Sequence, residues 1–205
     1  MNSSYPVAFG ILVKRSHRRS NYTMRKIVAG LFMSLDGVID SPENSPKKWG
    51  NAEIMTRIAE GVAKADTVLL GPQTYQFLAG FWQHQSDDVP MAKFLNNSPK
   101  YVVSQTLDTL DWQPATLLRG DFAHEITKLK QQPGLNIQVP GSPTLVRSLL
   151  REGLLDELNL NICPVVAGSG MRLFGGIEES INLKLIDSKG YSNGVLAVTY
   201  QIVKS

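Results

Sequence analysis

From residue 24 onward, apolar runs of strand length alternate with segments whose apolar residues recur at helical spacing. Residues 27–33 form a near-continuous apolar run, which is typical of a central strand covered on both faces. The spacing of apolar residues from 52 to 65 predicts a helix, and residues 67–70 predict a second buried strand. This alternation indicates an α/β protein.

The second half of the chain continues the alternation and ends in an antiparallel hairpin. Residues 158–162 alternate strictly between apolar and polar side chains, as in a strand with one solvated face. We therefore expect one domain with a mostly parallel sheet of about eight strands and flanking helices. The remaining expected elements are strands at 101–104, 116–118 and 137–139, helices at 122–130 and 144–152, and hairpin strands at 183–188 and 195–203.

Residues 136–150 show the most informative local pattern, because a strand-like run passes through small residues directly into a helix. Ser142 stands at the N-cap position, Pro143 at the first helical position and Gly153 just after the helix end. The N–H groups at the helix start, together with a small Gly141, would let a phosphate contact the backbone. The alternative is an ordinary capped turn that binds nothing.

Composition and charge exclude two function classes. The chain is 42% hydrophobic and 19% charged, as in globular proteins, and no apolar run approaches the roughly 18 residues of a membrane span. The net charge of +3 would favour nucleic-acid binding only if the basic residues gathered in the folded part. Residues 1–23 hold four of the basic residues, so residues 24–205 contain 17 basic and 18 acidic side chains and are nearly neutral. We expect neither a nucleic-acid nor a membrane partner.

We interpret residues 1–23 as a disordered or expression-derived extension or an upstream start, with the folded domain at 24–205. A transit peptide is the weaker reading. Cys163 is the only cysteine and lies in an apolar segment, so we expect it to be buried rather than nucleophilic. A single cysteine also fits a reducing cytoplasm. No dinucleotide or Walker glycine motif and no metal-ligand spacing occurs, so no metal site is expected.

Several motifs in fixed order resemble the reductase domain of the dihydrofolate reductase superfamily that forms the C-terminus of riboflavin-pathway bifunctional deaminase-reductases, and its stand-alone relatives. The resemblance covers about residues 24–204. The motifs are Ser34-Leu35-Asp36-Gly37, Leu69-Leu70-Gly71-Pro72-Gln73-Thr74-Tyr75, Val102-Val103-Ser104, Val139-Pro140-Gly141-Ser142-Pro143-Thr144-Leu145, Leu155-Asp156-Glu157-Leu158, and Pro164 through Phe174.

The resemblance implies a nicotinamide dinucleotide, usually NADPH, across the carboxyl ends of the sheet. It assigns the pyrophosphate to Gly141, Ser142, Thr144 and Leu145, and the adenosine side to Gly71, Thr74 and Ser104. The family commonly has Arg after that first glycine. This chain has Pro72, which removes a charge-assisted contact to the 2′-phosphate and makes NADH a possible cofactor.

The reaction implied is hydride transfer to a C=N or carbonyl carbon of a small heterocyclic or sugar-derived substrate. Asp36 is the candidate catalytic residue, for holding substrate hydroxyls or delivering a proton, although it could equally be an Asp-Gly turn residue. Trp49 and Glu53 are candidate substrate residues, and Arg172 is a candidate for a substrate phosphate. A solvated Glu53 and a surface Arg172 are the simpler alternatives.

Two rival functions remain open at this point. A pterin reductase of the dihydrofolate reductase type would need a carboxylate on the first helix, where Glu53 stands. A non-catalytic nucleotide-binding or regulatory protein would fit Pro72 and the altered turn at Pro140, where riboflavin-pathway members usually carry an acidic residue. The alternating strands near the C-terminus favour a homodimer.

Overall fold

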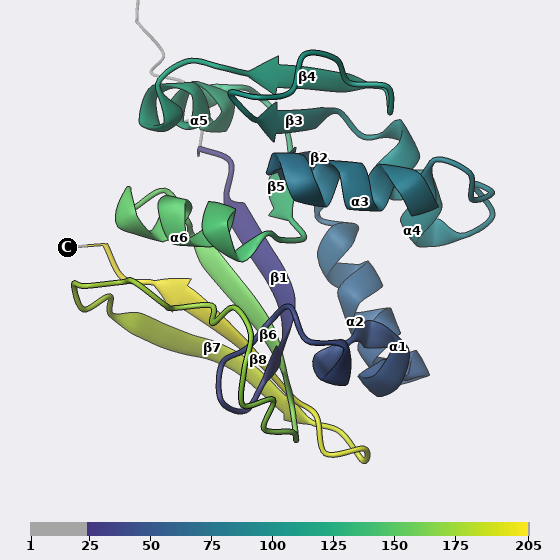
Figure 1. Ribbon diagram of the computed structural model, residues 1–205, viewed down its shortest axis with the longest axis vertical. Coiled ribbons are helices and arrows are strands. Elements are labelled where there is room, and N and C mark those ends of the chain that lie inside the picture. The colour runs from purple at the N-terminus through teal and green to yellow at the C-terminus, as the bar shows by residue number, and fades with distance from the viewer. Residues whose placement is uncertain (1–23, 205) are drawn as a thin grey trace, which may run out of the picture.

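The computed structural model describes residues 24–204, so the expectations for residues 1–23 lie outside the described part. One eight-stranded sheet forms the centre, in the order β4-β3-β2-β5-β1-β6-β8-β7, with β4 and β7 at its two edges (Figure 1). The strands are β1 Ile27–Ser34, β2 Ala65–Leu70, β3 Lys100–Val103, β4 Ala115–Leu118, β5 Asn136–Val139, β6 Glu157–Cys163, β7 Leu183–Gly190 and β8 Leu196–Ile202.

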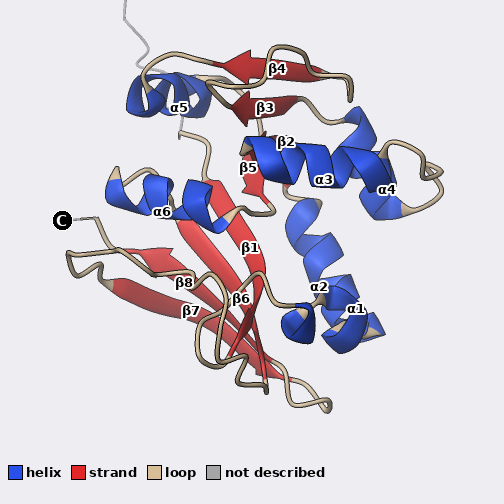
Figure 2. Cartoon of the chain, in the orientation of Figure 1, coloured by secondary structure: helices blue, strands red, loops and turns tan. Residues whose placement is uncertain are grey.

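The six strands from β4 to β6 are parallel, and the C-terminal strands reverse the direction. β8 pairs antiparallel with β6, and β7 pairs antiparallel with β8. The helices pack around this sheet (Figure 2) and are η1 Pro42–Asn44, α1 Pro46–Trp49, α2 Ala52–Val62, α3 Pro72–Trp82, α4 Pro90–Asn97, α5 Phe122–Gln131 and α6 Pro143–Arg151. The expected mostly parallel sheet with a C-terminal antiparallel hairpin is confirmed.

Helices cover both faces of the sheet, and β2 shows how the sequence arranges this. Leu69 packs in the large core that contains the apolar residues of α5 and α6. Its neighbours Val68 and Leu70 point to the other face, where they pack with Tyr75 of α3 and Leu95 of α4. All three strand residues are fully buried. This explains why the central strands are continuous apolar runs rather than alternating ones.

Several element boundaries differ from the sequence prediction. The expected helix 52–65 ends at Val62, because Ala65 already pairs with Asn136 in the sheet. The segment from 40 to 50 contains the short helices η1 and α1. Helix α4 was not expected. Among the described residues no helix is long and apolar enough to cross a membrane.

The end of α4 is held by a buried lysine. Lys100 begins β3 and is fully buried, and its Nζ donates to the carbonyl oxygens of Leu95 (2.8 Å), Asn96 (3.3 Å) and Ser98 (3.0 Å). These are carbonyl groups at the C-terminus of α4, which its own helix leaves unpaired. The ring of Trp112 lies 4.6 Å from the same Nζ. Burial lowers the pKa of Lys100 to about 8.

Candidate functional site at the carboxyl ends of the parallel strands

The sequence-predicted site residues follow the carboxyl ends of five adjacent parallel strands. Ser104 follows β3, Gly71 follows β2, Gly141 follows β5 and Asp36 follows β1. Arg172 lies in the loop after β6 and forms an isolated bridge with Val38. Since carboxyl ends of parallel strands meet at one edge of a sheet, the fold brings these separate motifs to a common edge.

Two helix N-termini meet at the centre of this edge. Gly71 is the N-cap of α3 and Ser142 is the N-cap of α6. A Cβ built on Gly71 would lie 3.4 Å from the Oγ atom of Ser142. The two helices leave adjacent strands toward opposite faces of the sheet, which is the topological position where open α/β sheets bind ligands.

Both helices begin without a side-chain cap, which corrects the expectation for Ser142. Its backbone is extended as at an N-cap, but its side chain makes no capping hydrogen bond. By contrast, Asn51 caps α2 and Asp121 caps α5. Helices α1 and α4 also begin uncapped with Pro, but neither follows a strand of the sheet.

The consequence is a set of free backbone donors at the strand ends. The first backbone bonds into each helix come from Tyr75 in α3 and from Val146 in α6. Within the described part of the chain, no partner accepts from the N–H groups of Gln73, Thr74, Thr144 and Leu145. Four unpaired donors and two positive helix ends at one place are suited to an anion such as a pyrophosphate.

Gly141 is needed at this site because of its backbone conformation, whereas the sequence suggested only that its small size matters. Its φ angle is +131°, a region that residues with a Cβ rarely adopt, and the peptide bond to Ser142 is cis. A Cβ there would meet only the Cδ2 atom of Leu31 on β1, at 3.9 Å. Gly141 is thus required by its conformation rather than by crowding.

Asp36 is held by the loop that follows β6. Its Oδ1 accepts from Ser34 Oγ (2.7 Å) and from the N–H of Ala167 (2.9 Å), and its Oδ2 accepts from the N–H of Gly168 (3.0 Å). These bonds, that from Ser34 first, lower the pKa of Asp36 to about 2. A carboxyl that is ionised at neutral pH has no proton to deliver. The geometry instead makes Asp36 an anchor between the loops after β1 and β6.

Arg172 completes this junction. Its guanidinium donates to the Asp36 carbonyl and lies 3.6 Å from Asp36 Oδ2, while half of the side chain stays exposed. Sequence reasoning missed Arg147 in α6, which donates to the carbonyl oxygen of Arg172 (3.3 Å) and lies 3.4 Å from Thr144 Oγ1. Arg147 stands three residues after Thr144, so helical spacing could have indicated it. Arg147 is therefore a cation beside the start of α6, and Arg172 is a second cation at Asp36.

Ser104 has a local structural task. Its Oγ accepts from the backbone N–H groups of Thr106 and Leu107, both at 3.1 Å, and so stabilises the turn after β3. Thr74 lies in the first turn of α3. The predicted adenosine-side residues thus border the strand ends.

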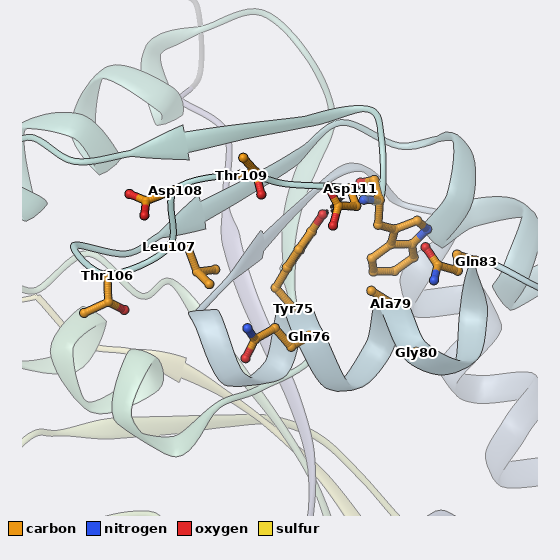
Figure 3. Close-up of a pocket in the computed structure, with 11 residues that line it drawn as sticks. Tyr75, Gln76, Ala79, Gly80, Gln83, Thr106, Leu107, Asp108, Thr109 and Asp111 are labelled. Carbon is orange, nitrogen blue, oxygen red and sulfur yellow. Dashed lines mark hydrogen bonds between the residues drawn. The ribbon is translucent and has the colours of Figure 1, made fainter.

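A pocket of about 530 Å³ lies beside them, between α3 and the connection from β3 to β4 (Figure 3). It contains none of the predicted cofactor residues. Tyr75 and Trp112 are joined there by a 2.7 Å bond from the Trp112 N–H to the tyrosine hydroxyl. Asp108 and Asp111 give this pocket two carboxylates, which disfavour a phosphate. We therefore place the anion site at the helix starts.

Trp49 and Glu53 contact the hairpin of β7 and β8. The Trp49 indole donates to the carbonyl oxygen of Glu43 (2.5 Å), and its own carbonyl accepts from Asn193 in the turn between β7 and β8 (2.8 Å). The Glu53 side chain is 60% exposed and lies 3.5 Å from Lys189 of β7. Its carboxylate is thus directed to the sheet edge.

Cys163 is buried, as expected, and burial raises the pKa of its thiol to about 11.

Comparisons with known proteins agree with this architecture. The family description "RibD C-terminal domain" matches residues 25–197. YyaP, an uncharacterized protein of Bacillus subtilis, is 29% identical over 184 residues, which cover 88% of this chain and 97% of YyaP.

Two solved structures share the fold. A deaminase/5-amino-6-(5-phosphoribosylamino)uracil reductase of Thermotoga maritima has a TM-score of 0.64 at 13% identity, covering 88% of this chain and 57% of that one. A dihydrofolate reductase of Enterococcus faecalis complexed with NADP(H) has a TM-score of 0.60 at 14% identity, covering 87% and 97%.

Proposed function

Because the chain belongs to the RibD C-terminal domain family, we propose that it is a nicotinamide-dependent reductase of a small heterocyclic or sugar-derived substrate. The single observation that supports this most strongly is the pair of uncapped helix starts at the ends of β2 and β5. The four free N–H groups at these helix starts can donate hydrogen bonds to a dinucleotide pyrophosphate. The related fold of Enterococcus faecalis dihydrofolate reductase holds NADP(H).

In this proposal, residues at different strand ends bind different parts of the dinucleotide. Gly141, Ser142, Thr144 and Leu145 receive the pyrophosphate, as the resemblance assigns. Gly71 and Thr74 border the adenosine half, and the turn held by Ser104 closes that side. The nicotinamide half then extends toward β1 and the junction of Asp36 with Arg172.

The reduced nicotinamide supplies a hydride to an electrophilic carbon, and the chain contributes orientation and charge. The Asp36 carboxylate fixes the loop after β6 through the N–H groups of Ala167 and Gly168. Arg172 and Arg147 can attract an anionic substrate group. Since Asp36 is ionised, we propose that the proton needed to neutralise the reduced product comes from water rather than from this carboxyl.

Cofactor preference depends on the adenosine side. With Pro72 in place of the family's Arg, the guanidinium that commonly meets the 2′-phosphate is missing. Arg119 follows β4, and its guanidinium donates to the carbonyl oxygen of Leu107, so a cation lies next to the turn after β3. Asp108 partly neutralises it at 3.2 Å. We propose that NADPH and NADH both bind, in the cytoplasm where both are available.

For the substrate, we propose the type reduced by the Thermotoga maritima relative, a ribosylamino-substituted pyrimidine or a close analogue. Pro140, where riboflavin-pathway members usually carry an acidic residue, favours an analogue over the pathway substrate itself. We favour this over the pterin-reductase alternative, because the exposed Glu53 carboxylate lies 3.5 Å from Lys189 of the edge strand β7. A non-catalytic nucleotide-binding protein remains the second candidate, because the Asp36 carboxylate already accepts from Ser34 and from two backbone N–H groups.

The first experiment is a titration of the purified protein with NADPH and, separately, NADH, followed by nicotinamide fluorescence. Saturable binding of either nucleotide is expected. The absence of any binding would exclude the reductase proposal. Nucleotide oxidation in the presence of a pyrimidine substrate would then distinguish a reductase from a non-catalytic nucleotide-binding protein, which would bind without turnover.

A further inference from the structure

Strand β1 continues past the end of its neighbour β5 in the middle of the sheet (Figure 1). β5 ends at Val139, which pairs with Ala29, and β1 extends beyond this pair. Residues 30–32 of β1 are half-buried, although the residues before and after them are buried. A Cβ on Gly141 would lie 3.9 Å from Leu31 Cδ2, so this half-buried part of β1 borders the proposed nucleotide site.

Three side-chain amides lie around this part of β1, on the face of the sheet that α2 covers. Gln138 belongs to β5, and Asn159 and Asn161 belong to β6. Their apolar neighbours along both strands pack in the large core on the opposite face. Because side chains alternate along a strand, the amides point toward α2. Phe32, which pairs with Asn161, packs with Ile54 of α2 on this same face.

Gly30 separates the amides and leaves room between them. It pairs with Asn159 in β6, and a Cβ built on it would lie 3.2 Å from Nε2 of Gln138. The Gln138 amide thus extends over β1 in the direction of β6. A flat ring can lie on Gly30, because no side chain projects there. We call Gly30, Gln138, Asn159 and Asn161 the amide patch.

Within residues 24–204, no group hydrogen-bonds to the three amides of the patch. The bonds at neighbouring positions involve other atoms: Arg57 donates to Thr199 Oγ1 (3.2 Å), and Cys163 Sγ donates to the backbone carbonyl of Asn161 (3.8 Å). The alternation at 158–162 is typical of a solvated face, yet Asn161 is only 8% exposed. Polar groups withdrawn from water normally have a partner, and asparagine is depleted in strands. The amides therefore indicate a ligand with hydrogen-bonding groups.

The charges around the patch favour an uncharged ligand. Each carboxylate that the described residues place near it already has a basic partner. These pairs are Glu157 with Lys26 (2.5 Å), Asp187 with Arg57 (2.6 Å) and Glu53 with Lys189 (3.5 Å). Arg57 also donates to Thr199, which pairs with Asn159. A cationic ring would thus meet a cation and no free counter-charge, whereas amides donate to and accept from a neutral ring.

We propose that Gln138, Asn159 and Asn161 are specificity-determining residues, whose amides hydrogen-bond the edge of an uncharged heterocyclic ring that lies over Gly30. A ring with adjacent carbonyl and N–H groups can form two hydrogen bonds with one amide side chain. Diaminopyrimidine cations, which require a carboxylate, are rejected. This assignment rests on the proposed reductase function and adds the groups that select the substrate.

The test compares two small rings by isothermal titration calorimetry with the full chain and saturating NADPH. The compound 5,6-diaminouracil has carbonyl groups where 2,4,5,6-tetraaminopyrimidine has amino groups, and the latter is a cation below its ring pKa. Below that pKa, the uracil should bind about tenfold more tightly or better. Asn159→Asp supplies a carboxylate and should shift the preference toward the cation.

Two further variants remove single amides. Asn159→Leu and Gln138→Leu should each weaken binding of the uracil about tenfold and leave the NADPH affinity unchanged. Gln201→Leu is the matched control, since Gln201 is an exposed amide on the same face of β8, opposite Glu157. Because the Asn159 amide has no protein partner, Asn159→Leu should leave Tm unchanged or raise it. A fall in Tm together with lost binding would show a structural role instead.

Three other results would overturn the proposal. One is a protein that binds NADPH but not the uracil. Another is uracil binding that neither leucine variant weakens, which would place the ring elsewhere. The third is an unchanged ring preference in Asn159→Asp. If neither nicotinamide nucleotide binds, the reductase proposal fails, and titration of the uracil alone into the wild type and Asn159→Leu then decides the role of the amide patch separately.

Discussion

Replacing Gly141 by Ala tests the nucleotide site most directly. The φ angle of +131° must change or be strained when a Cβ is present, at a cost of about 1–2 kcal/mol. For a chain of this size that corresponds to a fall in Tm of about 2–8 °C. The nearest atom to the new methyl group is Leu31 Cδ2 at 3.9 Å, so no clash adds to the penalty.

The effect on nucleotide binding should be larger than the effect on stability. A shift in the Gly141 backbone moves Ser142 and turns the N–H groups of Thr144 and Leu145 away from a bound pyrophosphate. One charge-assisted hydrogen bond is worth about 1.5–3 kcal/mol, so NADPH binding should weaken about ten- to a hundredfold. Fluorescence titration measures the affinity, and thermal unfolding without ligand measures the stability.

Gly153→Ala provides the matched control. Gly153 also has a positive φ angle, +61°, and no atom lies within 4 Å of the position of its Cβ. It lies at the opposite end of α6, so it carries similar backbone strain away from the site. We expect a comparable loss of Tm with unchanged NADPH affinity. Equal affinities of the two variants for NADPH would refute the assignment of the pyrophosphate to the start of α6.

Three further outcomes follow from single residues. Pro72→Arg, at the first position of α3, should raise the affinity for NADPH relative to NADH about tenfold, whereas Pro46→Arg at the start of α1 should leave the ratio unchanged. Asp36→Asn should speed amide exchange at Ala167, and since the folded pKa of about 2 lies below the ordinary 3.8, Asp36 should stabilise the wild type above pH 4 and lose this effect as the pH falls toward 2. Burial lowers the pKa of Lys100 from 10.5 to about 8, so between these values the unfolded chain binds a proton that the folded chain has lost, and stability should rise with pH by up to about 3 kcal/mol. Urea unfolding at pH 7.5 to 9 should show the first part of this rise, about 1.3 kcal/mol, in the wild type and a flatter profile in Lys100→Met; equal slopes would contradict the shifted pKa.

Much of the fold could be predicted from the sequence because its signals are local. The apolar run at β1 and the helical spacing of α2 and α6 depend on neighbours within a few residues, and these elements were expected with errors of a few positions. Helix α4 escaped prediction for the opposite reason. It has eight residues, and its end is stabilised by Lys100, whose side chain reaches back to carbonyl groups of the helix.

For the site residues too, the sequence predicted what depends on local pattern and missed what depends on distant contacts. Spacing along the chain placed Asp36 and Arg172 after strands, but their contact joins positions 136 residues apart, which no local pattern encodes. The pKa of Asp36 follows from that distant loop, so its role as an ionised anchor became visible only with the fold.

Ser142 shows where sequence reasoning ends. Pro143 and Gly153 bound a helix whether Ser142 caps it or not, so the residues alone allowed both an ordinary capped turn and an anion site. The two interpretations differ in one torsion angle, that of the Ser142 side chain. In the structure its Oγ faces Gly71 on the neighbouring strand end and caps nothing. Gly71 lies 71 residues earlier in the sequence, so the two helix starts lie together only because β2 pairs with β5. The proposed anion site therefore depends on the sheet order, and a sequence pattern can indicate it only after that order is known.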